Sequence, residues 1–164
     1  RLDRLHQALQ AAFGWTDSHL WEITAAGVSW GIPDPDWPDD MLDGRKTTLL
    51  DMLEDTGAKT LRYLYDFGDG WEHVIKITAI TDGDPQENYP VLIDGNGRCP
   101  PEDVGGPWGY GNFLEVISDP GHEEHDHWTE WAPPGFDPND AQIEKRKDAV
   151  AKLAIKWKPR RQKK

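Results

Sequence analysis

The chain of 164 residues has a single cysteine, Cys99, and lacks any long apolar run. One cysteine excludes an intramolecular disulfide framework and a zinc site built from cysteines alone. No apolar stretch approaches the roughly 20 residues that a membrane helix needs, and the chain does not open with the charged and then apolar segments of a secretory leader. These absences predict a cytoplasmic protein with no membrane partner.

The composition is acidic and rich in tryptophan. The chain has 30 Asp and Glu against 18 Lys and Arg, a net charge of −12, and 37% hydrophobic residues. Such a polar composition is compatible with disorder, but nine tryptophans argue against it, because disordered chains are poor in aromatic residues. The length corresponds to about one domain. The sequence starts at Arg1 and enters a predicted helix almost at once, so we expect that an N-terminal segment is missing from it.

The charge is unevenly distributed along the chain. Residues 145–164 carry ten of the 18 basic residues and one acidic residue, Asp148, so this segment is +9 and residues 1–144 are −21. A basic segment binds nucleic acid by neutralising phosphates and releasing counterions. It is equally suited to remaining solvated or to folding back onto the acidic body. Nucleic acid is therefore a candidate partner only through this end, where residues 158–164 form a basic tail.

Local patterns predict two helices in the first part of the chain. Apolar residues recur at a spacing of three and four through residues 2–13, with Gly14 as a stop, which is typical of an amphipathic helix. Thr48 and Asp51 have the spacing of a capping box that opens a short helix closed by Gly57. We also expect a turn at residues 15–18, a strand over residues 19–24 and a proline-rich loop over residues 31–43.

The strongest strand signal is an antiparallel hairpin. Alternating aromatic residues at 61–67, a Gly-Asp-Gly turn at 68–70 and β-branched residues at 74–80 predict its two strands. We further expect a strand at 90–94, an irregular segment at 95–111 and helices at 112–118 and 139–157, the last opened by Asp137 and Pro138. The predicted fold is a single α+β domain over residues 1–157, with a mostly antiparallel sheet and several packed helices.

Three carboxylates and an imidazole surround the predicted hairpin turn, namely Asp66, Asp69, Glu72 and His73. Carboxylates and neutral imidazole bind metals and carry protons, so this group is a candidate metal or acid/base cluster. In the alternative, the turn requires Asp69 and the neighbouring glycines for their positive φ, and His73 lies on a sheet face. We favour this alternative.

Two further segments carry reactive side chains. Cys99 begins a loop rich in proline and glycine, where it is either a nucleophile beside a histidine or a buried thiol, the commoner role. The densest cluster of ligand types contains His122, His125 and Asp126, and helical spacing there would allow a divalent cation to bind. A solvated polar turn is the alternative, which we favour. A ring of tryptophans around a cleft would bind a flat or apolar ligand, although core packing is the usual role of tryptophan.

Three segments have motifs that are specific in combination. The first is Leu-His-Gln-Ala at 5–8 through Phe-Gly-Trp-Thr-Asp-Ser-His-Leu at 13–20, and the second is Tyr-Asp-Phe-Gly-Asp-Gly-Trp-Glu-His at 65–73. The third is Cys-Pro-Pro-Glu-Asp-Val-Gly-Gly at 99–106, followed by Gly-Tyr at 109–110 and Phe-Leu at 113–114. Through them, residues 2–155 resemble the plasmid pRiA4b ORF-3-like family. Members of that family begin with a β-hairpin that carries a Trp-Arg-Arg-type motif, which this sequence does not contain.

The resemblance implies an accessory or passenger protein of plasmids or mobile elements, and some relatives are labelled putative resolvases. A serine resolvase needs a nucleophilic serine and clustered arginines, but the chain has three serines, and a body at −21 repels DNA. We therefore reject recombinase chemistry. If the three segments meet, they form an acidic site suited to a cation or a basic peptide. The candidate ligand-binding or partner-binding residues are Trp15, Asp17, His19, Asp66, Asp69, Trp71, His73, Cys99, Glu102, Asp103 and Tyr110.

Three hypotheses about function follow. The favoured one is a binding or interaction domain without enzymatic activity and without a cofactor, whose partner is a protein or a small ligand. The second is a metal-dependent hydrolase that uses histidine and carboxylate side chains on a divalent metal. The third is a nucleic-acid-binding protein that acts through its basic C-terminal segment.

Overall fold

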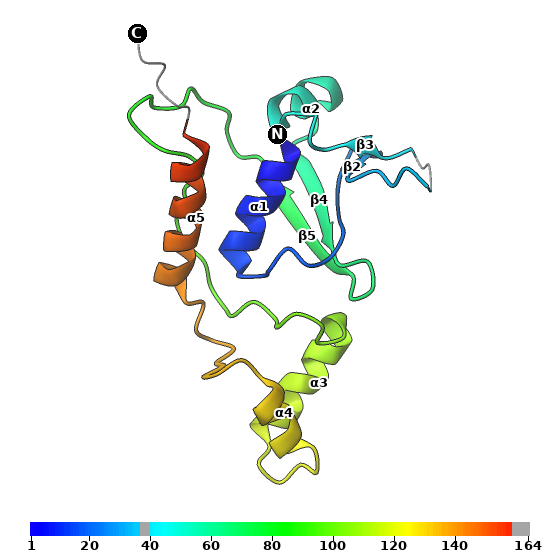
Figure 1. Cartoon of the computed structure of the whole chain (residues 1–164), viewed down its shortest axis with the longest axis vertical. Helices are drawn as coiled ribbons and strands as arrows, with labels where there is room; N and C mark the ends of the chain where they lie inside the picture. Colours follow the sequence, from blue (N-terminus) through cyan, green and yellow to red (C-terminus); the bar gives the residue numbers. More distant parts are fainter. Residues whose placement is uncertain (37–39, 159–164) are drawn as a thin grey trace.

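A five-stranded sheet forms the centre of the fold (Figure 1). The computed structural model describes residues 1–36 and 40–158. Strands β1 (Trp21–Ala25), β2 (Val28–Gly31), β3 (Leu42–Asp43), β4 (Thr60–Tyr65) and β5 (Trp71–Lys76) lie in the order β3-β2-β1-β4-β5. The β2–β3 pair is parallel and the other neighbours are antiparallel. The predicted α+β class with a mostly antiparallel sheet is confirmed.

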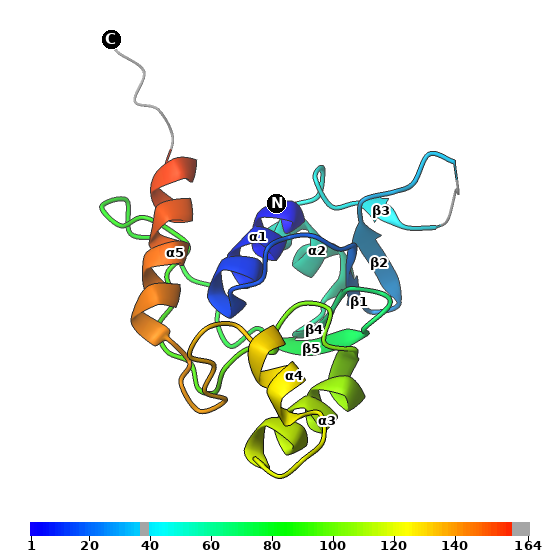
Figure 2. The ribbon, with the colours of Figure 1, turned by 60° about the horizontal axis from the view of Figure 1, so that its bottom comes forward.

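One face of the sheet buries large side chains. Leu61, Tyr63 and Tyr65 of β4 are fully buried, whereas Thr60 and Arg62 on the other face are exposed. This alternation follows from the period of two of a strand. Helix α1 (Leu2–Phe13) packs over the buried face, and the connection between β4 and β5 places residues 66–70 at one end of the sheet (Figure 2).

The first two predicted helices are confirmed. Helix α1 ends at Gly14, whose φ of 94° is left-handed and whose N–H donates to the Gln10 carbonyl oxygen. Helix α2 (Leu49–Thr56) begins with the predicted capping box, because the Thr48 hydroxyl accepts from the Asp51 N–H at 3.1 Å and the Asp51 carboxylate accepts from the Thr48 N–H at 3.2 Å. Local sequence signals therefore suffice for both helices.

Parts of the strand prediction were wrong. Strand β5 ends at Lys76 rather than at residue 80, and residues 90–94 form no strand. Residues 90–92 instead line a cavity with Ala154 and Ile155 of α5 (Ile143–Trp157), so their apolar side chains face a helix. The predicted loop at 31–43 contains the end of β2 and all of β3, and its residues 37–39 lie outside the described part of the chain.

Two helix boundaries also differ from the prediction. Helix α3 (Gly106–Ser118) begins inside the segment predicted to be irregular, because left-handed Gly105 and Pro107 in the first turn are compatible with a helix start. Helix α5 begins at Ile143 rather than at 139. The Asp137 carboxylate accepts from the Asn139 N–H at 2.8 Å, which makes a separate turn ahead of that helix.

The remaining helices pack mainly on other helices. Helix α4 (His125–Trp131) packs on α3, where Phe113 meets Trp128 at 5.6 Å between ring centroids. Helix α5 lies beside α1, and the Arg4 guanidinium lies 5.2 Å from the centroid of the Trp157 ring (Figures 1 and 2). None of the helices in the described residues combines the length and the apolar content that crossing a bilayer requires.

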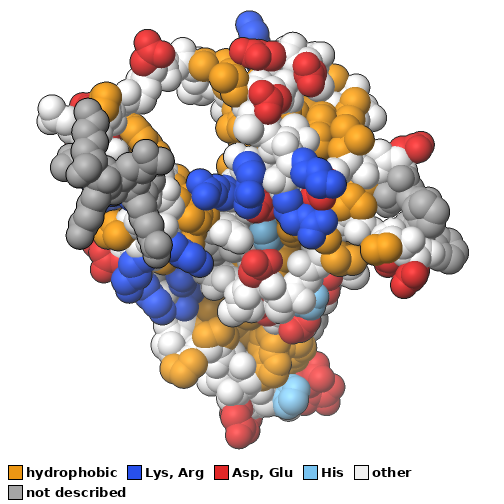
Figure 3. Space-filling view, turned by 45° about the horizontal axis from the view of Figure 1, so that its top comes forward, with side chains coloured by type: hydrophobic (Ala, Val, Ile, Leu, Met, Phe, Trp, Pro, Cys, Tyr) orange, Lys and Arg blue, Asp and Glu red, His pale blue; other side chains and the backbone are white. Residues whose placement is uncertain are grey.

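Basic side chains are grouped on the surface. Across the middle of the face in Figure 3, Lys and Arg side chains gather next to hydrophobic ones, while acidic side chains lie mostly around the edge of that face. Of the predicted basic tail, Lys158 is described and residues 159–164 lie outside the described part of the chain.

Gly106 holds α3 against the hairpin turn, since a Cβ at this position would overlap the Asp69 carbonyl oxygen and its φ is 68°. Gly106→Ala should therefore lower the free energy of unfolding by at least about 2 kcal/mol, as measured by urea denaturation. Gly111→Ala on the same helix is the matched control, because nothing lies within 4 Å of its added Cβ. That control should be neutral or stabilising by up to about 1 kcal/mol. Equal effects of the two substitutions would contradict the proposed contact.

Candidate functional site

A closed ring of hydrogen bonds joins α1, β4 and the loop after α1. His6 Nε2 lies 2.6 Å from Asp17 Oδ1 and His6 Nδ1 lies 2.8 Å from the Tyr63 hydroxyl. The Gln10 side-chain amide donates to the Tyr63 hydroxyl at 3.0 Å, and the Asp17 N–H donates to Gln10 Oε1 at 2.9 Å. The ring fixes the loop that leads into β1 and carries His19.

The ring also determines the protonation of His6. A carboxylate only accepts, so Nε2–H donates to Asp17, and Nδ1 of the neutral ring accepts from the Tyr63 O–H. Burial lowers the pKa of His6 against the opposing effect of Asp17, which is consistent with a neutral imidazole. His6 is 2% exposed, and its ring stacks on the Trp21 ring with 4.7 Å between the ring centroids. Asp17 is thereby committed to a structural contact.

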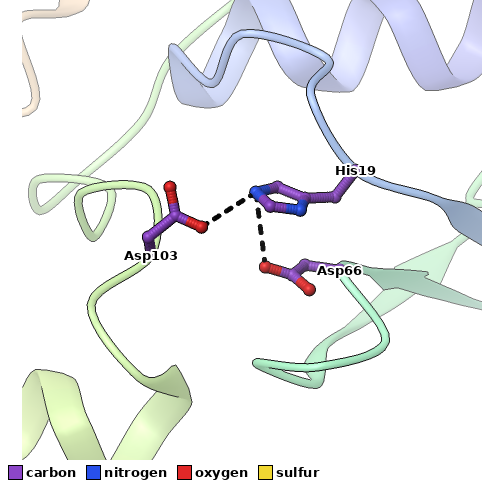
Figure 4. Close-up of side chains that lie close together, drawn as sticks. All are labelled: His19, Asp66 and Asp103. Carbon is purple, nitrogen blue, oxygen red and sulfur yellow. Dashed lines mark ion pairs between the residues drawn. The ribbon is translucent and has the colours of Figure 1, made fainter.

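Three segments far apart in the sequence bring one imidazole and three carboxylates together. Figure 4 shows the imidazole with two of the carboxylates, Asp66 and Asp103. His19 lies in the loop before β1, Asp66 follows β4, and Glu102 and Asp103 precede α3. Measured from His19 Nε2, Asp103 Oδ1 is at 3.2 Å, Asp66 Oδ2 at 3.6 Å and Glu102 Oε2 at 3.8 Å. We call these four residues the acidic centre.

Local hydrogen bonds orient the carboxylates of the acidic centre. Asp66 has a left-handed φ of 57°, and its Oδ1 accepts from the N–H groups of Gly68 and Asp69, which leaves Oδ2 facing His19. Glu102 Oε1 accepts from the Thr16 N–H at 2.8 Å. The Tyr65 hydroxyl also donates to Glu102, while it accepts from the Ser18 N–H. Asp103, with a φ of 58°, is exposed.

His19 Nε2 is buried and has no hydrogen-bond partner among the described residues. Its ligand atom and those of Asp66 and Asp103 lie within 4.8 Å of one another, a spacing at which three side chains can share one cation. Two donors bound at about 2.0–2.2 Å to one ion are about 3.0–3.5 Å apart, close to the spacing around His19. These three side chains thus offer donor atoms of the right type for a divalent cation, close together in space.

The other predicted hairpin and loop residues lie outside the acidic centre. Asp69 Oδ2 accepts from the Gly105 N–H at 3.1 Å and ties the turn to the start of α3. Tyr110 lies edge-on to Trp71 at 6.4 Å. Burial raises the pKa of Cys99 to about 12, so its thiol is protonated and unsuited to nucleophilic attack. Four of the predicted residues line a separate cavity, namely Trp15, Trp71, His73 and Cys99.

The second predicted metal cluster lies on α4 and the turn before it. His122 precedes the helix, and its Nδ1 accepts from the Glu124 N–H. His125 and Asp126 occupy the first turn, 3.5 Å apart, and Asp126 is exposed. Within residues 1–36 and 40–158, these side chains do not form a group of three with the ligand spacing found around His19.

Several residues of the site were not predicted from the sequence. His6, Gln10 and Tyr63 complete the hydrogen-bonded ring, and Tyr65 positions Glu102. The sequence contained one usable signal, the alternation of large apolar or aromatic residues with other residues along β4. It places two tyrosines on the buried face of the sheet, where their hydroxyl groups need hydrogen-bond partners. Their partners come from other elements, so spacing along the chain does not identify them.

Comparison with known proteins assigns the family. The model described as plasmid pRiA4b ORF-3-like protein matches residues 1–145. The chain belongs to this family. It is 49% identical over 158 residues to the uncharacterized protein y4hQ of Sinorhizobium fredii (strain NBRC 101917 / NGR234), covering 96% of this chain and 81% of that protein. The prediction made from the three motifs is confirmed.

A solved structure shares this fold. The crystal structure of a protein of unknown function, MM3350 from Methanosarcina mazei Go1, is similar at 34% sequence identity and a TM-score of 0.73. The similarity covers 84% of this chain and 78% of that chain. The names of these two similar proteins state no activity, so the chemistry of the site carries the functional argument.

Acid should destabilise the fold through His6 and His73. Burial lowers the pKa of both imidazoles below their ordinary value of 6.5. Below about pH 6.5 the unfolded chain therefore binds more protons than the folded one, and the free energy of unfolding decreases as the pH falls through the lowered folded pKa values. The midpoint of thermal unfolding should drop between about pH 7.5 and pH 5.

Two substitutions check this pH dependence. His73→Gln should flatten the profile, because it removes a buried imidazole while the amide can still donate to the Tyr63 carbonyl that His73 Nδ1 contacts at 3.2 Å. His127→Gln removes an exposed imidazole from α4 and is the matched control. A midpoint that does not change with pH, or equal profiles for His73→Gln and the parent, would show the assignment to be wrong.

Proposed function

We propose that this chain is a binding domain that holds a divalent cation in the acidic centre, through His19, Asp66 and Asp103. The observation that carries the proposal is the buried His19 Nε2, which has no hydrogen-bond partner in the described residues and faces carboxylates from two other segments. A buried nitrogen without a partner is unfavourable by about 1–3 kcal/mol. A cation would satisfy the nitrogen and neutralise the carboxylates together.

The alternative is a protonated His19 paired with the same carboxylates. A charged N–H of this kind usually aims at one oxygen at about 2.7–2.9 Å. The shortest contact of Nε2 is 3.2 Å, to Asp103, and it does not form a hydrogen bond. Three oxygens distributed around one nitrogen at 3.2–3.8 Å instead match donors arranged around a common ion.

The donor set favours a first-row transition metal. Imidazole suits zinc and its neighbours, and carboxylates suit manganese, whereas calcium and magnesium prefer oxygen ligands alone. Glu102 Oε1 accepts from the Thr16 N–H, and the Tyr65 hydroxyl lies within hydrogen-bond distance of both Glu102 oxygens. Glu102 Oε2, 3.8 Å from His19 Nε2, would be the fourth ligand. Mn²⁺ and Zn²⁺ are therefore the cations to test.

Calorimetric titration of tag-free protein, stripped with EDTA, tests the cation site. The parent should bind one Mn²⁺ or Zn²⁺ per chain, and Asp66→Asn should weaken binding by at least about tenfold because it removes a charged ligand. Asparagine keeps the oxygen that accepts from Gly68 and Asp69, so the turn is retained. Asp103→Asn should act in the same way on an exposed side chain.

Asp126→Asn is the matched control, since Asp126 is an exposed carboxylate of the other histidine-containing cluster. It should leave the affinity within about twofold of the parent. Absence of binding by the parent would refute the proposal. If Asp66→Asn left the affinity unchanged and Asp126→Asn lowered it, the cation site would lie on α4 instead.

The same centre also supports the hydrolase hypothesis. A cation held by three protein ligands would have further positions for water, and it would lower the pKa of that water. A cavity of about 510 Å³ lined by Glu102 and Asp103 adjoins the centre and has room for a substrate. Turnover of bis(p-nitrophenyl) phosphate that requires Mn²⁺ and disappears in Asp66→Asn would establish catalysis. Cation binding without such turnover would favour the binding domain over a phosphodiesterase.

Two finer predictions gain no support from the structure. The role as an accessory protein of plasmids or mobile elements rests on the family name. Nucleic-acid binding through the basic tail concerns residues 158–164, of which the structure describes Lys158. Both remain predictions.

A further inference from the structure

A second cavity, of about 380 Å³, shares Trp15, Arg98 and Arg146 with the cavity beside the acidic centre, but none of its lining residues belongs to that centre. The end of α1, β5, the segment before Cys99 and the start of α5 surround it. The Trp15 indole N–H donates to the Pro100 carbonyl oxygen at 3.0 Å, which fixes the Trp15 ring in the wall of this cavity. We call this cavity the aromatic pocket.

Flat rings form one wall of the aromatic pocket. The Phe13 ring stacks on the His73 ring, with 4.7 Å between their centroids. The Trp15 ring lies edge-on to His73, with centroids 5.6 Å apart, and is tilted relative to Trp71, with centroids 5.9 Å apart. Burial lowers the pKa of His73, so this ring is neutral near pH 7 and acts as an aromatic surface. Such a wall is suited to the flat apolar body of a small ligand.

The side chains of two arginines, Arg98 and Arg146, also line the pocket. Arg98 Nη1 is buried without a hydrogen-bond partner, and neither arginine has a carboxylate within 4.0 Å among the described residues. Burial and the nearby Arg98 charge lower the pKa of Arg146. Two unneutralised cations side by side repel each other, and an anion between them would remove that repulsion.

The charges that surround these arginines do not neutralise them. Arg146 donates to the neutral Gln142 side chain at 2.9 Å, and Arg98 lies over the Phe136 ring at 5.7 Å. Asp94 also lines the pocket, but it is exposed and its Oδ1 accepts from the Gly95 N–H. In a chain of net charge −12, two arginines without a carboxylate partner therefore leave positive charge at the pocket that an anionic ligand can neutralise.

We propose that the aromatic pocket binds a small molecule with a flat apolar body and one anionic group, a carboxylate, sulfonate or phosphate. The body lies against Trp15, Trp71 and His73, and the anion accepts hydrogen bonds from Arg98 and Arg146. The pocket volume falls in the usual range for small-molecule sites, about 300–1,000 Å³. This inference uses none of the residues proposed to bind the cation, and it stands or falls separately.

The test uses 8-anilino-1-naphthalenesulfonate on the folded chain in EDTA, so that no cation takes part. Binding should be saturable with one site per chain, and it should quench tryptophan emission because Trp15 and Trp71 line the pocket. N-phenyl-1-naphthylamine has the same rings without the sulfonate and is the uncharged comparison probe. Arg98→Gln and Arg146→Gln should each weaken sulfonate binding by about tenfold and change binding of the uncharged probe by less than about twofold.

Lys152→Gln is the matched control, since Lys152 is exposed on α5 and outside the pocket lining. It should leave both probes unaffected. A melting curve of each variant shows whether it is folded, and so excludes dye binding to unfolded protein. If Arg98→Gln does not fold, Arg98→Lys replaces it in the test. Because this variant keeps the charge, it should retain most of the affinity. Binding that does not saturate, or equal losses for the charged and uncharged probes, would overturn the proposal.

Discussion

The hydrogen-bonded ring of His6, Gln10, Asp17 and Tyr63 is the constraint on which the site depends. Each polar group in it satisfies another, in a place where an unpaired one would be unfavourable by about 1–3 kcal/mol. Closing the ring requires the loop after α1 to turn through Asp17 at a φ of 57°. That turn determines where His19 lies. The next tyrosine on the same face of β4, Tyr65, then connects the loop to Glu102.

The hairpin turn provides the second set of constraints. Asp66 folds back on its own turn, Asp69 binds the Gly105 N–H, and Gly106 contacts the Asp69 backbone so closely that no side chain fits between them. These contacts place the loop at 99–105 beside the hairpin. Three segments that share no local periodicity thus converge because polar groups at their turns satisfy one another.

How well the sequence predicted each feature depends on how far apart along the chain the interacting residues are. Helix α1, the capping box at Thr48 and the hairpin are encoded by residues close in the chain, and these predictions were confirmed. The start of α3 was missed because its glycines also suit an irregular loop, and residues 90–94 were misassigned because their partner is a helix far along the chain. The motifs contained all four residues of the acidic centre, but they did not show that Asp17 binds His6 or that His73 faces another cavity.

The loop at 98–103 connects the two proposed sites, since Arg98 lines the aromatic pocket while Glu102 and Asp103 belong to the acidic centre. Hydrogen bonds from Trp15 to Pro100 and from Thr16 and Tyr65 to Glu102 hold this loop in place between the two sites. The arrangement also changes the meaning of the basic C-terminal segment. Arg146 belongs to that segment, yet it lies in a pocket of the acidic body, close enough to Gly14 that a Cβ there would overlap its guanidinium. Part of the segment's positive charge thus completes the folded domain rather than forming a free arm.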